Sequence, residues 1–146
     1  MGALLRVPFL TSTMQIYEAL LAAGIDDLTH AHLAVFRHID EQRGSRLIDL
    51  ADEAQIAKQS MGYLVDYLEE HGYVERVPDA RDGRARLIRL TKHGEAVMKV
   101  ARDSVRKTEE EWAQYLGSER LDQLREILKD LTAILESARH AEGQPR

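Results

Sequence analysis

Six basic residues lie between positions 76 and 92 of a chain whose formal net charge is −5. They lie in and around the segment PDARDG, residues 78–83, which also holds the only two acids of this stretch, Asp79 and Asp82. The six basic residues are Arg76, Arg81, Arg84, Arg86, Arg89 and Lys92. Clustered arginine attracts phosphate even on a protein that is acidic overall. The cluster therefore indicates a nucleic-acid partner, and the alternative is a solvated charged loop.

Asp82 lies two residues before Arg84 in this segment. At that spacing we expect its carboxylate to accept the Arg84 guanidinium and to hold it at the tip of a turn. An arginine held there could enter a DNA minor groove, where the negative potential is enhanced. Asp79 is expected to be a turn-forming residue only.

A helix predicted over residues 56–72 carries a second set of polar side chains. At 100° per residue, the expected inner side gathers Ala57, Met61, Leu64, Val65 and Leu68, and the outer side gathers Gln59, Gly62, Tyr63, Asp66 and Glu70. The first two outer turns offer Lys58, Gln59, Ser60 and Tyr63, and acids begin only at Asp66. A recognition helix enters the major groove by its N-terminal half, so this grading is compatible with DNA reading, and the alternative is an ordinary amphipathic helix with a solvated polar face.

Most of the remaining sequence has a helical pattern, and these helices must position the cationic segment and the polar side chains of the 56–72 helix. Apolar periodicity predicts helices at 9–22, 29–39, 47–54, about 91–116 and a last one through 121–135. Two β-branched and aromatic runs, 73–77 and 84–90, predict a hairpin around the turn at 78–83. Gly24, Gly72 and Gly117 suit helix ends, and Thr29 and Thr91 suit helix starts. The fold class is mostly α with a small β-hairpin wing, arranged as a winged helix-turn-helix.

The segment LADEAQIAKQSMGYLVDYLEEHGYVERVPDARDGRARLIRLTKHGE resembles the core of the multiple antibiotic resistance regulator (MarR) family of bacterial winged-helix transcription factors. The wing matches the family pattern D-x-R-D-x-R at Asp79, Arg81, Asp82 and Arg84, and Leu90, Thr91 and Gly94 match the LT..G that follows. The resemblance covers about residues 28–100. One departure is Tyr63, where relatives often have arginine, so an operator sequence does not transfer.

The resemblance implies that one domain, residues 1–146, contains parts with two different functions. A DNA-binding lobe spans 28–95, and dimerisation helices span 1–25 and 96–140. Double-stranded DNA with a pseudo-palindromic operator is the implied partner, read by a homodimer. The DNA-binding residues are then Lys58, Gln59, Ser60, Tyr63, Arg81, Asp82, Arg84 and Arg86, with Arg84 in the minor groove.

Two further expectations concern the helices outside this lobe. Leu121, Leu124, Leu128, Leu131 and Leu135 recur at spacings of three and four, and such a stripe needs a partner helix, which a second chain would supply. By the family resemblance, a ligand pocket lies near Tyr17, His32, Phe36 and Trp112. A small aromatic molecule is the expected ligand, and the predicted function is that of a ligand-responsive repressor.

Other chemistry is poorly supported. The chain has no cysteine, and its six histidines lack a metal-ligand spacing, so no metal or cofactor is predicted. No phosphate loop, nucleophile elbow or triad pattern is present, so an enzyme is not predicted. No apolar run approaches a membrane span, and a cytoplasmic location is expected. A winged-helix protein-interaction module and a metal-dependent sensor or enzyme remain as alternatives.

Overall fold

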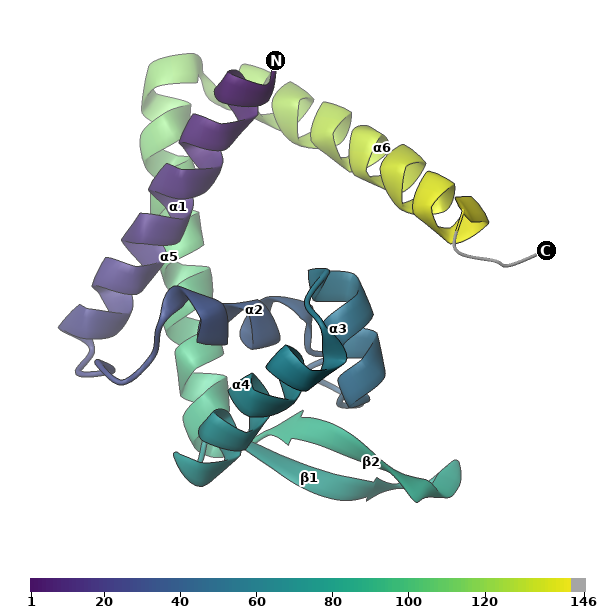
Figure 1. Ribbon diagram of the computed structural model, residues 1–146. Helices are drawn as coiled ribbons and strands as arrows, with labels where there is room; N and C mark the ends of the chain where they lie inside the picture. The colour runs from purple at the N-terminus through teal and green to yellow at the C-terminus, as the bar shows by residue number, and fades with distance from the viewer. Residues whose placement is uncertain (143–146) are drawn as a thin grey trace. The chain divides into compact units, whose positions relative to one another are not determined.

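The computed structural model describes residues 1–142, with side chains described as far as residue 139. Helices and a single hairpin follow one another along the chain (Figure 1): α1 Gly2–Ala22, α2 His30–His38, α3 Leu47–Ala54, α4 Lys58–Glu70, β1 Val74–Asp79, β2 Asp82–Leu90, α5 Lys92–Leu116 and α6 Ser118–Glu142. The predicted fold class is confirmed. The chain forms two compact units, residues 1–105 and 106–146, and each is described by itself. The predicted limits of the DNA-binding lobe, 28–95, and of the dimerisation helices, 1–25 and 96–140, stay predictions. His140, one of the six histidines, lies outside the residues whose side chains are described.

The first helix begins earlier than its apolar pattern predicts. It starts at Gly2 rather than Phe9 and includes Pro8. Proline removes one backbone donor within a helix, and its ring normally disfavours the preceding turn. Here the carbonyl of Met1 accepts the N–H groups of Leu4 and Leu5, which closes the first turn ahead of the proline.

The core of residues 1–105 lies among α2, α3, α4, the hairpin and the first turns of α5. Leu33, Phe36 and Ile39 are buried, and so are Met61, Val65 and Leu68 of the predicted inner row of α4, whereas Leu64 is half-buried. Ala57 is an exception, because it is the N-cap of α4 and is exposed rather than buried. The buried set also includes Leu20, Leu28, Leu50, Tyr73, Val74, Ile88, Leu90 and Val97.

The hairpin is longer than the sequence pattern indicates. Its strands pair antiparallel from Val74 with Leu90 to Asp79 with Asp82, and the register shifts between Pro78 and Asp79. The turn is therefore two residues, 80–81, instead of the predicted six. Ser45 pairs with Ile88 on the free side of β2, where each residue's N–H donates to the other's carbonyl oxygen at 2.9 and 2.8 Å.

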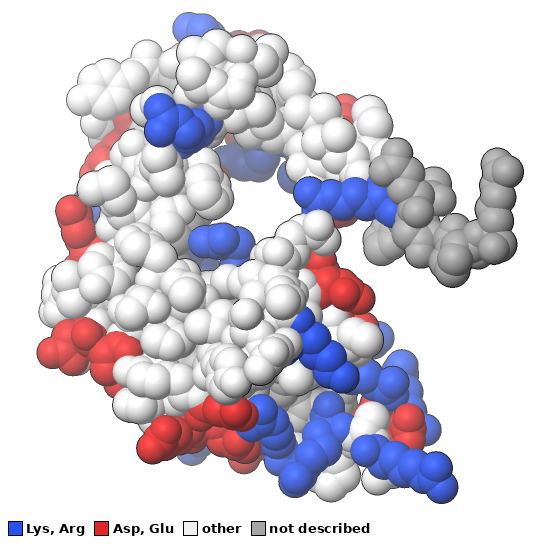
Figure 2. All heavy atoms as spheres, viewed as in Figure 1, with Lys and Arg blue, Asp and Glu red and all other residues white. Residues whose placement is uncertain are grey.

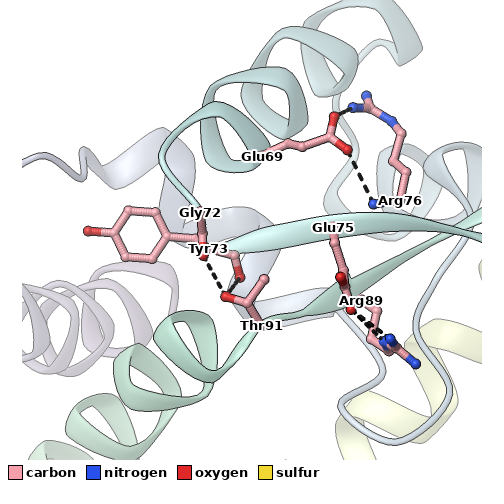
Figure 3. Close-up of polar contacts among 7 residues, drawn as sticks. All are labelled: Glu69, Gly72, Tyr73, Glu75, Arg76, Arg89 and Thr91. Atoms are coloured by element: carbon pink, nitrogen blue, oxygen red, sulfur yellow. Dashed lines mark hydrogen bonds and ion pairs between the residues drawn. The ribbon is translucent and has the colours of Figure 1, made fainter.

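Two residues fix the start of α5 against the hairpin. The Thr91 hydroxyl accepts the N–H of Gly94 at 3.2 Å, which confirms Thr91 as the helix cap, and it donates to the carbonyls of Gly72 and Tyr73 (Figure 3). A side chain at Gly94 would collide with the Tyr73 carbonyl oxygen. Glycine is thus required here because the helix and the backbone of Tyr73, just before β1, approach closely.

Helix ends lie where the glycines predict them. Gly24, Gly72 and Gly117 have φ of +81°, +77° and +82°, the left-handed conformation that glycine adopts without strain. The turn between α3 and α4 instead uses Gln55, at φ 54°.

The second unit, residues 106–146, contains the end of α5 and the whole of α6. Arg125 bridges them by donating to Glu109 of α5 at 2.9 Å and to Asp122 of α6 at 2.5 Å. Of the predicted leucine stripe, only Leu121 is buried. The other four stripe leucines are between 36% and 55% exposed, so the described residues of the second unit do not cover the stripe.

Candidate nucleic-acid interface

The helix-turn-helix consists of α3, a short step and α4, all within the first unit. Gln55 ends α3 in the left-handed conformation, and its side-chain amide donates to the carbonyl of Asp52 at 2.7 Å. Met61, Val65 and Leu68 of α4 are fully buried beneath the step. Burial of this row fixes the rotation of α4, so the opposite face of the helix points to solvent.

The outer face of α4 brings together the predicted base-reading residues. Lys58, Gln59, Ser60 and Tyr63 are all exposed, and Tyr63 is 65% exposed. Gln59 and Tyr63 touch, because the Gln59 Nε2 group donates a hydrogen bond to the Tyr63 hydroxyl at 3.1 Å. Gly62 is half-buried rather than fully outward, and its backbone lies beside Leu47 of α3.

The acids of α4 hold one of the six clustered cations. Arg76 of β1 donates to Asp66 at 2.6 Å and also forms an ion pair with Glu69, whose carboxylate accepts the Arg76 backbone N–H at 3.2 Å (Figure 3). These contacts tie β1 to the C-terminal half of α4. They also neutralise Arg76 within the protein, so it is not available to phosphate.

A second cation is paired across the hairpin. Arg89 of β2 donates to Glu75 of β1 at 2.6 Å, and the two residues are direct cross-strand partners (Figure 3). In the part of the chain with described side chains, Arg81, Arg84 and Arg86 form no salt bridge, and all three are exposed. Figure 2 shows positive side chains gathered over the hairpin. Among the described side chains, three of the four free cations of the segment are thus the arginines in and after the turn, and the fourth, Lys92, is exposed at the start of α5.

Asp79 is far more than a turn residue, which corrects the sequence prediction. Its side chain is 6% exposed, and it accepts from Arg46, the N-cap of α3, at 2.6 and 3.1 Å. It also accepts the backbone N–H of Arg81 at 2.9 Å. The backbone N–H and the Arg46 guanidinium hold the pKa of Asp79 below its ordinary value. Sequence reasoning missed Arg46 because its partner is 33 residues away.

The Asp82 carboxylate does not hold the Arg84 guanidinium as predicted. Its Oδ1 accepts the backbone N–H of Arg84 at 3.1 Å instead. A carboxylate that accepts an N–H two residues ahead forms a local turn and competes well with a flexible guanidinium for the same oxygen. Asp82 therefore shapes the backbone at the start of β2 and leaves the Arg84 side chain free.

The four residues predicted to line a ligand pocket are distributed over both units. His32 and Phe36 are buried in the core of the first unit, where Phe36 meets Tyr73 edge to face. Tyr17 is half-buried and stacks on His30 with ring centroids 5.0 Å apart. Trp112 belongs to the second unit, where it lines a groove between α5 and α6 with Leu121 and Leu124.

His32 has a structural role that spacing alone does not reveal. Its Nδ1 accepts the backbone N–H of Thr29 at 3.0 Å, closing a capping box at the start of α2. Its ring stacks on Tyr67, which stacks in turn on His71. Burial lowers the pKa of His32, although the negative charge of Asp27 opposes this shift.

The described residues offer little support for metal ligation or for membrane insertion. Among them no group of three or more His, Cys, Asp or Glu side chains could hold a metal ion. Nor does any described helix combine the length and the apolar character that a bilayer crossing requires.

Comparison with known proteins places this architecture in a family. A sequence model described as "MarR family" matches residues 26–85. The transcriptional regulator HosA of Escherichia coli O157:H7 is 30% identical over 95 residues, which cover 65% of this chain and 70% of HosA.

Solved structures agree over most of the chain. The transcriptional regulator Tm0710 of Thermotoga maritima superposes with a TM-score of 0.64 at 26% identity, covering 98% of this chain and 97% of its own. The repressor CouR, in complex with a 23-mer DNA duplex, gives 0.69 at 22% identity over 90% of this chain and 92% of its own. CouR from Rhodococcus jostii RHA1 has also been solved with p-coumaroyl-CoA, at a TM-score of 0.68 and 24% identity, covering 89% of this chain and 90% of its own. With its helix-turn-helix, its wing and these relatives, the chain belongs to the MarR family and is a DNA-binding transcriptional regulator.

Proposed function

We propose that this regulator binds an inverted repeat in double-stranded DNA as a homodimer, with α4 in the major groove and the wing beside it. One observation carries the proposal: the N-terminal half of α4 exposes only cationic or neutral polar groups, and the unpaired arginines lie in the wing turn and on the part of β2 that follows it. Two of the three acids of α4, Asp66 and Glu69, already pair with Arg76, and the third, Glu70, lies at the C-terminal end of the helix, away from the half that exposes Lys58 and Gln59. The CouR complex with DNA supports the same use of this fold.

The homodimer is supported by unpartnered apolar surface at both ends of the chain. On α1, Leu4, Val7 and Met14 are 57–72% exposed, and on α6 Ile127, Ile134 and Leu135 are 55–65% exposed. Large apolar side chains left in water on one helix are typical of interfaces. A two-fold dimer would place two recognition helices about one turn of DNA apart, or ~10 base pairs.

A small aromatic ligand is the proposed effector. The support is the structure of CouR with p-coumaroyl-CoA, together with the half-buried Trp112 in the groove between α5 and α6. A ligand changes DNA affinity only if it prefers one arrangement of the two recognition helices over another. Trp112 is the only tryptophan, so its fluorescence reports on binding directly.

Competing functions have less support. A protein-interaction module would deplete exposed cations at its contact surface, whereas Arg81, Arg84 and Arg86 are exposed and unpaired in the described chain. The relatives are transcriptional regulators, and we propose no catalytic step, metal or cofactor. Because the proposed partner is DNA, we propose a cytoplasmic location.

The test is selection of bound duplexes from a random library, followed by sedimentation of the protein. We expect an inverted repeat and a dimer at micromolar concentration. Leu124→Glu with Leu131→Glu should abolish both, while Gln123→Glu, which adds a negative charge to α6 outside the stripe, should abolish neither. A monomer, or a library that returns no enriched sequence, would contradict the proposal.

A further inference from the structure

The hydrogen bond between Gln59 and Tyr63 determines which groups of α4 remain free for a base. The two residues are one helical turn apart, both are exposed, and no other described residue contributes to their contact. A glutamine amide has two N–H donors and one carbonyl acceptor. The bond to the Tyr63 hydroxyl uses one N–H. One N–H and the Oε1 oxygen of Gln59 therefore remain, side by side in one plane.

A donor beside an acceptor complements one purine in particular. In the major groove adenine presents the N7 acceptor and the N6 amino donor, which match the free N–H and Oε1 of the amide. Guanine presents two acceptors, N7 and O6, so an amide held in this orientation would place Oε1 against O6 without a proton between them. Neither pyrimidine presents a donor and an acceptor side by side in the major groove.

We propose that Tyr63 is a positioning residue that fixes the Gln59 amide in the orientation that reads adenine, once in each half-site. The inference rests on the proposed entry of α4 into the major groove. A free amide can turn by 180° and present either edge, whereas one tied to a neighbouring hydroxyl has lost that freedom before DNA arrives. The reversed arrangement, with the Tyr63 O–H donating to Oε1, would leave two N–H donors and would favour guanine.

The phenol oxygen also keeps its own proton in this arrangement. Because Tyr63 accepts from Gln59, its O–H is free to donate to a neighbouring base or phosphate oxygen. Removal of the hydroxyl alone, in Tyr63→Phe, therefore frees the amide without removing the ring. Gln59→Ala removes the reading group itself.

The experiment compares duplex libraries selected by the parent protein, Tyr63→Phe, Gln59→Ala and the double variant. We expect the parent to prefer adenine by about tenfold at one position of each half-site, equal to one bidentate contact of about 1.4 kcal/mol. Gln59→Ala should remove that preference. Tyr63→Phe should reduce the ratio of adenine to guanine severalfold, and the double variant should match Gln59→Ala.

The matched control is Tyr115→Phe, which deletes the same hydroxyl from a tyrosine that is 88% exposed in the second unit. It should leave the base preference unchanged. A parent preference for guanine at the position that Gln59→Ala flattens would overturn the inference, and so would an unaltered adenine preference in Tyr63→Phe. Failure of the parent to enrich any sequence would instead count against the proposed DNA site as a whole, so the two failures are distinguishable.

Discussion

The carboxylate of Asp79, at the end of β1, accepts two hydrogen bonds from the guanidinium of Arg46, the residue that precedes α3. The same carboxylate accepts the N–H of Arg81 in the turn. One buried acid therefore connects the turn end of the wing to the helix-turn-helix. Arg81 lies in this turn, and Arg84 and Arg86 follow it on β2, so the connection orients the free arginines relative to α4.

Loss of this connection should weaken DNA binding while the fold persists. Arg46→Ala removes the partner of a nearly buried carboxylate, and we expect the affinity for a selected operator to fall about tenfold, the value of one misplaced groove contact. Lys99→Ala, which breaks an exposed ion pair with Asp103 on α5, is the control and should change affinity by less than twofold. Titration of one duplex with each variant measures the difference. Equal losses in both variants would argue against the role of Arg46.

The Asp79 contact should be insensitive to pH in the physiological range. Its folded-state pKa lies below the ordinary 3.8. An acid with a lowered folded pKa contributes stability above its unfolded pKa and loses it as the pH falls through the folded value. Asp79→Asn should therefore lower thermal stability at pH 7 and lose this effect toward pH 3. Unfolding curves of the parent and of Asp79→Asn between pH 7 and pH 3 measure this difference, and a difference that did not shrink toward pH 3 would contradict the prediction.

Asp82 should act through the backbone and not through its charge. Asn at this position keeps an oxygen for the Arg84 N–H, whereas Ala removes it. We expect Asp82→Asn to retain parent affinity or to bind slightly tighter, because it removes a negative charge near phosphate, and Asp82→Ala to bind several times more weakly. If instead both variants weaken binding equally at two salt concentrations, the charge of Asp82 is what matters.

The arginines of the wing should differ in their effect on salt dependence. Arg84→Gln removes an exposed, unpaired cation, and the slope of log affinity against log salt should fall by about one. Arg89→Gln removes the same formal charge, but Arg89 is already paired with Glu75. Its slope change should be clearly smaller. Binding isotherms at four salt concentrations provide the comparison, and indistinguishable slopes would mean that both arginines meet phosphate.

Two glycines of the DNA-binding lobe should respond oppositely to alanine. At Gly94 the new methyl group would collide with the Tyr73 carbonyl oxygen, so we expect a loss of about 1–3 kcal/mol in the free energy of unfolding. At Gly62 the nearest atom to a new Cβ is Leu47 Cδ2, at an ordinary contact distance of 3.9 Å. Gly62→Ala should therefore stabilise α4 by roughly 0.5–1 kcal/mol. Denaturant unfolding of both variants tests the pair, and a destabilised Gly62→Ala would show that the α3–α4 contact is tighter than the structure has it.

His32 should make stability fall in mild acid. Its folded pKa is below the ordinary 6.5, because burial disfavours the charged ring, and the unfolded chain therefore binds the proton more readily. The contribution of His32 to the stability of the folded state is fully present above pH 6.5 and declines below it. His32→Gln keeps a capping-box acceptor for the Thr29 N–H but cannot titrate, so it should flatten the decline between pH 7 and 5.5. Melting temperatures that fall equally in parent and variant would assign the decline to other groups.

The sequence by itself determined the order of elements and the outward face of α4. Apolar spacing and turn residues act locally, so the hairpin, the glycine stops and the exposure of Lys58, Gln59 and Tyr63 could be predicted from neighbours along the chain. The cationic segment at 76–92 was equally visible, because charge is a property of composition.

Tertiary structure decided which of these charges are free. Arg76 and Arg89 are neutralised by acids that strand register and helix packing bring to them, whereas Arg84 is not. The pairing of Arg46 with Asp79 and the close approach at Gly94 likewise join segments far apart in sequence. No local pattern encodes such contacts, because they depend on how α3, the hairpin and α5 dock on a shared core.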